Sequence, residues 1–236
     1  AESALLAPIS VEALAFDDQD PSQAIEPATV VAGPELIRKR GQSLGATLAD
    51  TPGISSADFG QGVGRPVIRG QSGARVRVQE NGLASADVST LSQDHAVSID
   101  PYSARQVEVL KGPASVLYGR ASPGGLVSLT SKRPEFEQSG QVRLGVGNNA
   151  QRSAAFDLTG PLDDERRLAY RVTGLAESAD TQFGPVEDKR YAFAPQLTWD
   201  MTDDTSLTLH AYLQKDPEGG YHSGVPYEGA VERHNG

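Results

Sequence analysis

The second half of the chain is marked by a long two-residue alternation of apolar and polar positions. In residues 141–146, Val142, Leu144 and Val146 are apolar, while the positions between them are arginine and glycine. Runs with the same period follow at 152–159, 167–177, 190–200 and 206–214. This period puts alternate side chains on opposite faces of a β-strand. The pattern therefore predicts five antiparallel strands with one apolar and one polar face.

The lengths of these runs and of their connections favour a membrane barrel. Each run has about 8–12 residues, the length of a tilted transmembrane strand. Short acidic turns at 162–165 and 200–204 alternate with longer loops at 179–188 and from 215 onward, an asymmetry typical of outer-membrane barrels. A closed membrane barrel needs at least about eight strands, so we expect only the first part of a wall. The alternative is a soluble β-rich binding protein, because a β-sandwich alternates in the same way.

In the first half of the chain, strand-like and helical segments follow one another, a pattern that predicts a small α/β domain. Strand-like runs at 28–31, 66–69, 75–79, 106–110 and 123–129 are interspersed with helical segments at 33–39, 43–48 and 115–119. The alternation within these strands predicts a half-exposed sheet. Residues 1–27 show little periodicity and contain the acidic stretch 17–20, which indicates a flexible arm. We therefore divide the chain into an arm (1–27), an α/β domain (28–135) and barrel strands (136–236).

Composition narrows the possible functions. Lys and Arg number 21 against 31 Asp and Glu, a formal charge of −10, which argues against a nucleic-acid partner. With no cysteine, a disulfide framework and a thiolate metal site are excluded. The sequence contains no run of about 18 apolar residues, so it predicts no transmembrane helix. The start Ala1-Glu2-Ser3 lacks the basic and apolar regions of a signal peptide, so we expect one to have been removed already.

Enzyme motifs are not convincing. Residues 145–150 match the dinucleotide-binding spelling GxGxxA, but an alternating strand follows where a phosphate-binding helix would begin. This segment is therefore predicted to be a hairpin loop. No GxSxG, HExxH or P-loop pattern occurs in the sequence. We expect the protein not to be an enzyme and to have no resident cofactor.

Several motifs resemble TonB-dependent outer-membrane receptors. They are Leu48-Ala49-Asp50-Thr51-Pro52-Gly53-Ile54, Pro66-Val67-Ile68-Arg69-Gly70, the run Val107 to Gly119 with Lys111-Gly112-Pro113 at its centre, and the run Ser122 to Pro134. They stand in the order of the domain called the plug, which fills the barrel of these receptors. The resemblance extends from about residue 28 to the end of the chain.

The resemblance implies a fold, a location and partners. The α/β domain would be an α+β plug of small mixed sheet and short helices, inside a barrel of about 22 strands. The receptor would lie in the outer membrane of a Gram-negative cell as a monomer surrounded by lipid, with its plug facing the periplasm. It would import a metal chelate with energy delivered by TonB, together with ExbB and ExbD. The extended segment Ile9-Ser10-Val11-Glu12-Ala13 suits strand addition to TonB.

The resemblance favours a ferric siderophore as the ligand, with free zinc as the close alternative. Residues 65–119 look most like zinc-uptake receptors, in which an Asp-His pair at the plug apex binds the metal; here that pair is Asp94-His95. Residues 115–236, with Tyr221, look more like ferrichrome-type siderophore receptors, although His222 and Gly224 replace the expected aromatic side chains. Carboxylate and imidazole are suitable zinc ligands, and His222 could be a third. The alternative for Asp94-His95 is an ordinary loop pair.

Other residues are expected to have structural roles in the plug. Gly112, Gly119, Gly124 and Gly125 would supply positive φ angles and close packing, next to the motif residues Gly70 and Pro113. His210 is expected to face the barrel interior and bond to the plug. Five cations would pair with acids of the plug and the wall, unless they form only a solvated face: Arg69, Arg75, Arg77, Lys111 and Arg120.

Overall fold

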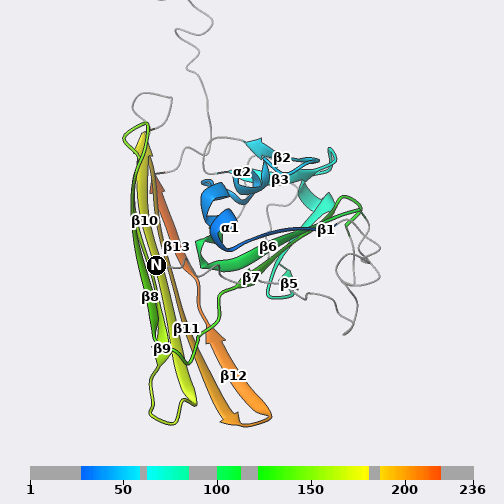
Figure 1. The fold of residues 1–236 in the computed structure, drawn as a ribbon. Helices are drawn as coiled ribbons and strands as arrows, with labels where there is room; N and C mark the ends of the chain where they lie inside the picture. Colours follow the sequence, from blue (N-terminus) through cyan, green and yellow to red (C-terminus); the bar gives the residue numbers. More distant parts are fainter. Residues whose placement is uncertain (1–27, 59–62, 85–99, 113–121, 181–186, 219–236) are drawn as a thin grey trace, which may run out of the picture.

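A computed structural model of the chain describes residues 28–58, 63–84, 100–112, 122–180 and 187–218. They form an α/β domain that lies against one face of a tall antiparallel sheet (Figure 1). The α/β domain contains β1 (Ala28–Ala32), α1 (Gly33–Lys39), α2 (Leu44–Leu48), β2 (Ile54–Asp58), β3 (Gly64–Ile68), η2 (Gly73–Arg75), β4 (Val76–Glu80), β5 (Leu83–Ala84), η3 (Pro101–Ser103), β6 (Ala104–Lys111) and β7 (Gly125–Ser131). The tall sheet contains β8 (Ser139–Val146), β9 (Arg152–Pro161), β10 (Leu168–Asp180), β11 (Glu187–Thr202), β12 (Thr205–His210) and β13 (Leu213–Glu218). No helix among the described residues is long and apolar enough to cross a membrane.

The sheet of the α/β domain is mixed, as the resemblance implied. Its order is β1-β6-β7-β4-β5, in which β4 and β7 run parallel and the other pairs antiparallel. The side chains of Leu36, Leu44 and Leu48 on the two helices form one buried cluster with Val107 and Val109 of β6. Helix α2 begins where the Ser43 hydroxyl accepts a hydrogen bond from the Ala46 amide at 3.1 Å. Two short helices are thus held in place by packing against the sheet.

The expectation of a half-exposed sheet is wrong. The second face of this sheet carries Gln79, Gln106, Glu108 and Ser128, and all four side chains are buried. Gln79 donates to the Ser128 hydroxyl at 3.2 Å, and Gln106 donates to Glu108 at 2.7 Å. Alternation of polar and apolar residues indicated water on the polar face, whereas these polar groups are satisfied by one another.

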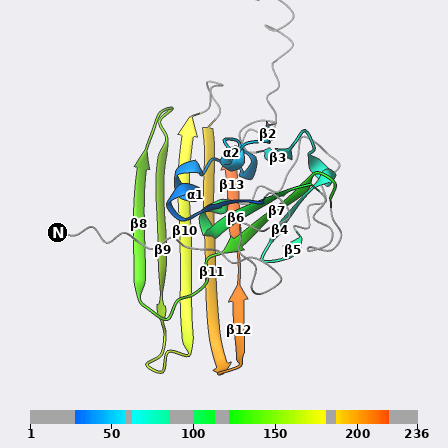
Figure 2. The same cartoon turned by 45° about the vertical axis from the view of Figure 1, so that its right-hand side comes forward.

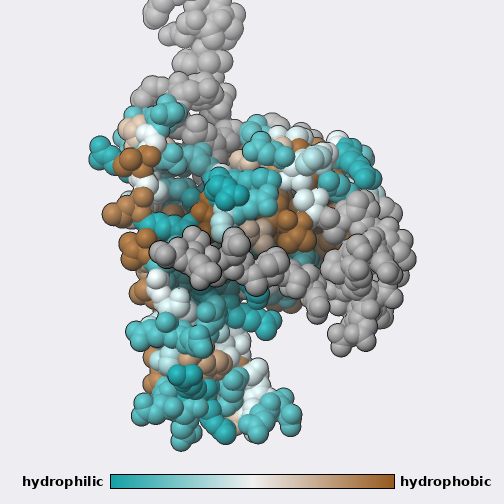
Figure 3. Space-filling view, viewed as in Figure 1, coloured by the Kyte–Doolittle hydropathy of each residue, from teal (hydrophilic) through white to brown (hydrophobic). Residues whose placement is uncertain are grey.

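The tall sheet has the alternation that the sequence predicted. Side chains that face away from the α/β domain are apolar, and some are well exposed, such as Leu144 (81%) and Trp199 (48%). Figure 3 shows this apolar material along the outer edge of the sheet, away from the α/β domain. The opposite face carries Asp157, Thr173, Arg190 and other polar side chains that are buried beneath the α/β domain. One face is therefore suited to lipid and the other to a polar interior.

The fifth predicted run is divided into two strands. β12 and β13 lie end to end and both pair with β11, separated at residues 211–212 (Figure 2). The Ala211 amide donates to the Pro195 carbonyl at 3.1 Å. Proline has no amide hydrogen to return this bond, so the ladder is interrupted at that point. The hairpin predicted at residues 145–150 is confirmed, because β8 and β9 pair antiparallel on either side of it.

Candidate functional site: the interface between the α/β domain and the tall sheet

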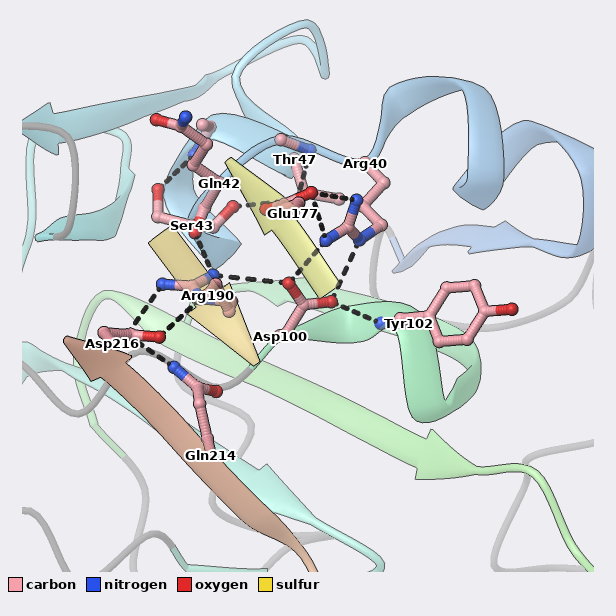
Figure 4. A network of polar contacts seen from close by, with 12 residues as sticks. Arg40, Gln42, Ser43, Thr47, Asp100, Tyr102, Glu177, Arg190, Gln214 and Asp216 are labelled. Carbon is pink, nitrogen blue, oxygen red and sulfur yellow. Dashed lines mark hydrogen bonds and ion pairs between the residues drawn. The ribbon is translucent and has the colours of Figure 1, made fainter. Parts of the chain in front are cut away.

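A chain of alternating charges joins the α/β domain to the tall sheet (Figure 4). We call it the central network. In order, its members are Glu177, Arg40, Asp100, Arg190 and Asp216. Arg40 and Asp100 belong to the α/β domain, and the other three side chains come from β10, β11 and β13. The network is nearly dry, since the exposed fraction of these side chains runs from 0% for Asp100 to 17% for Arg40.

Asp100 is the centre of this network. Arg40 donates to both of its carboxylate oxygens, from Nε at 2.9 Å and from Nη2 at 2.7 Å. The same carboxylate caps η3, because Oδ1 accepts the Tyr102 amide at 2.9 Å. The Asp100 amide donates to the Tyr212 hydroxyl at 3.2 Å, between β12 and β13. One turn of the α/β domain is thus bound directly to the sheet through both its side chain and its backbone.

Arg190 is the corresponding cation of the sheet. Its Nε and Nη2 donate to the two carboxylate oxygens of Asp216 at 3.0 and 3.1 Å, a bidentate pair between β11 and β13. Its Nη1 reaches across to Asp100 Oδ2 at 3.3 Å and also donates to the Gln42 carbonyl. Gln214 supports the pair by donating to Asp216 at 2.7 Å. Arg190 therefore binds the α/β domain while keeping its own partner within the sheet.

Asp100 and Arg40, the pair at the centre of the network, are both held in their charged forms. Burial opposes the charge on Asp100, but the hydrogen bonds and charge of Arg40, with the charge of Arg190, hold the pKa of this carboxyl below its usual value. Burial also opposes the charge on Arg40, and the contacts with Asp100 and Glu177 outweigh it and raise its pKa. Both groups thus remain ionised at neutral pH.

A second cluster, the linker network, lies where the chain passes from β7 to β8. Lys132 donates to Asp157 at 2.8 Å, and Arg171 forms a bidentate pair with the same carboxylate at 2.8 and 2.9 Å. Arg171 also contacts Glu135 at 3.0 Å. The Lys132 ammonium lies 4.7 Å from the centre of the Tyr102 ring, within cation–π range. Residues of η3 therefore contact both networks.

All the predicted ligand and TonB-binding residues fall outside the described part of the chain: Asp94, His95, Tyr221, His222, Ile9, Ser10, Val11, Glu12 and Ala13. Three residues predicted to have structural roles in the plug also lie outside it: Pro113, Gly119 and Arg120. Within the described residues, no group of three or more His, Asp or Glu side chains is arranged to hold a metal ion. The interface between the α/β domain and the tall sheet is therefore the candidate functional site among the described residues.

The described motif residues form tight connections within the α/β domain. Arg69 and Gly70 have φ angles of 49° and 78° in a turn closed by reciprocal bonds between Ile68 and Gln71. Gly112 has a φ angle of 110°. The backbone packs closely at the two glycines before β7. A Cβ on Gly124 would lie 2.7 Å from the Arg75 carbonyl oxygen, and one on Gly125 would lie 2.2 Å from that of Leu110.

Two of the cations expected to pair with acids have other partners among the described residues. Lys111 donates to the Pro52 carbonyl at 2.6 Å, and Arg75 donates to the Gln71 side chain at 3.0 Å; neither partner is an acid. In the described part of the chain, Arg40 and Lys132 of the α/β domain form ion pairs with acids of the sheet. His210 pairs with Gln196 in the ladder, and Gln196 is buried on the inward face.

Sequence reasoning did not single out the central network. One signal was present: Glu177 and Arg190 occupy the polar positions of strongly alternating strands, where charge is expensive unless it is paired. Another was Asp100 directly before Pro101, a typical start of a helical turn. Neither signal identifies partners that lie up to 137 residues apart in the sequence.

The fold and the interface define a class of protein. A mixed α/β domain bonded to the polar face of an antiparallel sheet, whose other face is apolar, is the arrangement of an outer-membrane barrel with a plugged interior. Residues 20–126 match the family model of the TonB-dependent receptor plug domain. The chain therefore contains a domain of this plug family. The α/β domain is accordingly named the plug, and the tall sheet is named the wall.

Relatives named as siderophore receptors match both parts of the chain. The ferrioxamine B receptor of Salmonella typhimurium (strain SL1344) is 46% identical over 209 residues, which are 85% of this chain and 30% of that receptor. The ferrichrome outer membrane transporter/phage receptor of Escherichia coli (strain K12) is 38% identical over 206 residues, 86% of this chain and 27% of that protein. The chain thus spans less than a third of the length of these relatives.

Solved structures of outer-membrane receptors are similar in fold to this chain. The pyoverdine outer membrane receptor FpvA of Pseudomonas aeruginosa PAO1 is similar with a TM-score of 0.71 and 26% identity, over 81% of this chain and 28% of that one. The alcaligin receptor FauA of Bordetella pertussis shares the fold, with a TM-score of 0.68 at 22% identity over 83% of this chain and 33% of that one. The soluble β-domain alternative is therefore set aside.

Proposed function

We propose that these residues are the plug and the first wall strands of an outer-membrane transporter that imports a ferric siderophore of the ferrioxamine or ferrichrome kind. The observation that carries the proposal is the 46% identity to a ferrioxamine B receptor, which extends through both the plug and the wall. The domain division is part of the proposal: arm 1–27, plug 28–135 and wall 136–236. The plug would face the periplasm, and the receptor would be a monomer without enzymatic activity.

The interface supports a transport role on physical grounds. A plug held by paired charges and hydrogen bonds can be displaced more readily than one held by a continuous apolar core, because water can replace polar contacts one by one. The outer membrane offers no ATP to drive the displacement. In this proposal, TonB with ExbB and ExbD supplies the work through the segment Ile9-Ser10-Val11-Glu12-Ala13.

Zinc uptake through Asp94 and His95 is the second candidate. It rests on the sequence alone, because both residues lie outside the described part of the chain. The two ligand classes make different demands: zinc needs the carboxylate and the imidazole as direct ligands, whereas a siderophore already encloses its iron.

The signal peptide is proposed to be absent from the mature receptor.

Binding to the purified full-length receptor separates the two candidates. Ferrioxamine B, ferrichrome and zinc are titrated against the wild type, Asp94→Ala and His95→Ala. We expect the wild type to bind a ferric siderophore, with at most a modest loss in either variant. Zinc binding that disappears in both variants, with no siderophore binding in the wild type, would replace the first candidate by the second.

A further inference from the structure

The central network is divided into two bidentate pairs, one on each side of the interface. Arg40 holds Asp100 within the plug, and Arg190 holds Asp216 within the wall. Within the central network, the charged contacts that cross between plug and wall are Arg40 to Glu177, from two nitrogens at 3.1 Å, and the single contact of Arg190 with Asp100 at 3.3 Å. Each guanidinium therefore has a bidentate carboxylate partner on its own side.

This division decides what happens when plug and wall separate. Breaking a buried ion pair so that one charge is left alone is costly, because nothing replaces the lost partner. Here Arg190 would lose Asp100 and the Gln42 carbonyl but keep both oxygens of Asp216. Arg40 would keep both oxygens of Asp100. Glu177 would lose Arg40, and its carboxylate would face a space open to water.

We propose that Asp216 is a positioning residue for transport: it neutralises Arg190 within the wall, so that the plug can leave without stranding that charge. The proposal rests on the proposed function, in which the plug moves. Asp216 has no contact with the plug among the described residues; its partners there are Arg190 and Gln214. Without the charge of Asp216, Asp100 is the one carboxylate among the described residues that remains within ion-pair distance of Arg190, and the plug is held more tightly.

The sign of the effect makes the proposal testable. A merely structural Asp216 predicts that Asp216→Asn loosens the interface, whereas the positioning role predicts that it tightens it. The reporter is Ser103→Cys in the full-length receptor, in a background free of other accessible cysteines. Ser103 is buried next to Asp100 on η3, and the present chain has no cysteine of its own. Maleimide labelling of this cysteine in mild urea measures how often the plug separates from the wall.

We expect Asp216→Asn to slow the labelling by at least about tenfold, the effect of one unpaired buried charge. The matched control Asp200→Asn removes a carboxylate of β11 that forms no ion pair with a described residue, and it should label like the wild type. Arg190→Gln should label faster than the wild type. In the double variant of Arg190→Gln and Asp216→Asn, the slow labelling should disappear.

Labelling of Asp216→Asn that is equal to or faster than that of Asp200→Asn overturns the proposal. If Asp216→Asn does not assemble, Asp216→Ser takes its place because it also removes the charge, and labelling equal to or faster than that of Asp200→Asn overturns the proposal there too. Uptake of iron-labelled ferrioxamine B is measured in the same variants. Absent uptake in the wild type refutes the proposed function, while the labelling rates still judge the role of Asp216.

Discussion

Replacing Asp100 by alanine should strongly destabilise the folded plug against unfolding. The side chain is fully buried and accepts from Arg40, Arg190 and the Tyr102 amide. Breaking a buried pair costs about 3–5 kcal/mol, and we expect the lower end because each arginine keeps a second acid. The lost cap of η3 adds about 1 kcal/mol. The sum, about 4 kcal/mol, corresponds to a factor on the order of 10³ in the unfolding equilibrium of the plug.

Hydrogen exchange of the full-length receptor measures this unfolding directly. Val107 and Val109 lie in the plug core, and their amides exchange when the plug unfolds. Asp100→Ala should accelerate their exchange by at least about a hundredfold, given the spread of such energies. The control Asp50→Ala removes an exposed plug carboxylate and should leave exchange unchanged. Acceleration of less than about threefold in Asp100→Ala would refute the reasoning, because the network would then contribute little.

Three further predictions concern other parts of the structure. Gly125→Ala places a Cβ 2.2 Å from the Leu110 carbonyl oxygen at a φ of 133° and should destabilise the plug by about 1–3 kcal/mol, seen as a lower melting temperature; an unchanged melting temperature would contradict this close packing. Burial raises the pKa of Glu108, opposed only by Gln106, so its ionisation costs stability as pH rises above about 4.3, the unfolded value. Glu108→Gln should therefore stabilise the receptor at pH 7 and lose this advantage at pH 4, and a gain independent of pH would show that ionisation is not the cause. Leu209→Arg, on the outward face, should make the free energy of folding into liposomes less favourable by up to about 2–4 kcal/mol, whereas Thr208→Arg, on the inward face, should leave it unchanged. Equal effects of the two variants would argue against a lipid-facing surface.

The strands of the wall were predictable from the sequence because their alternation is local. Val142, Leu144 and Val146 establish a two-residue period within a single strand, and no distant residue is needed to interpret it. The break between β12 and β13 was not predicted, because it depends on Pro195 lying opposite Ala211 in a neighbouring strand. The pairing of two strands depends on both segments, so the sequence of one strand does not reveal it.

The candidate site was less predictable for the same reason. Arg40 is 60 residues from Asp100 and 137 from Glu177, so their pairing arises only from the way the plug lies against the wall. Motif resemblance directed attention to Lys111, whose partner is a carbonyl in the plug itself. The buried polar face with Gln106 and Glu108 was likewise expected to be solvent-exposed, because a sequence does not show what covers a sheet.

If this plug and wall belong to a ferric siderophore transporter, as we propose, the full-length receptor should import a ferric siderophore. Uptake of iron-labelled ferrioxamine B and ferrichrome is measured in cells that lack their own receptors for both and express the full-length receptor, with and without functional TonB. We expect uptake of at least one of them that requires both the receptor and TonB. Uptake of neither, or uptake that continues without TonB, would contradict it.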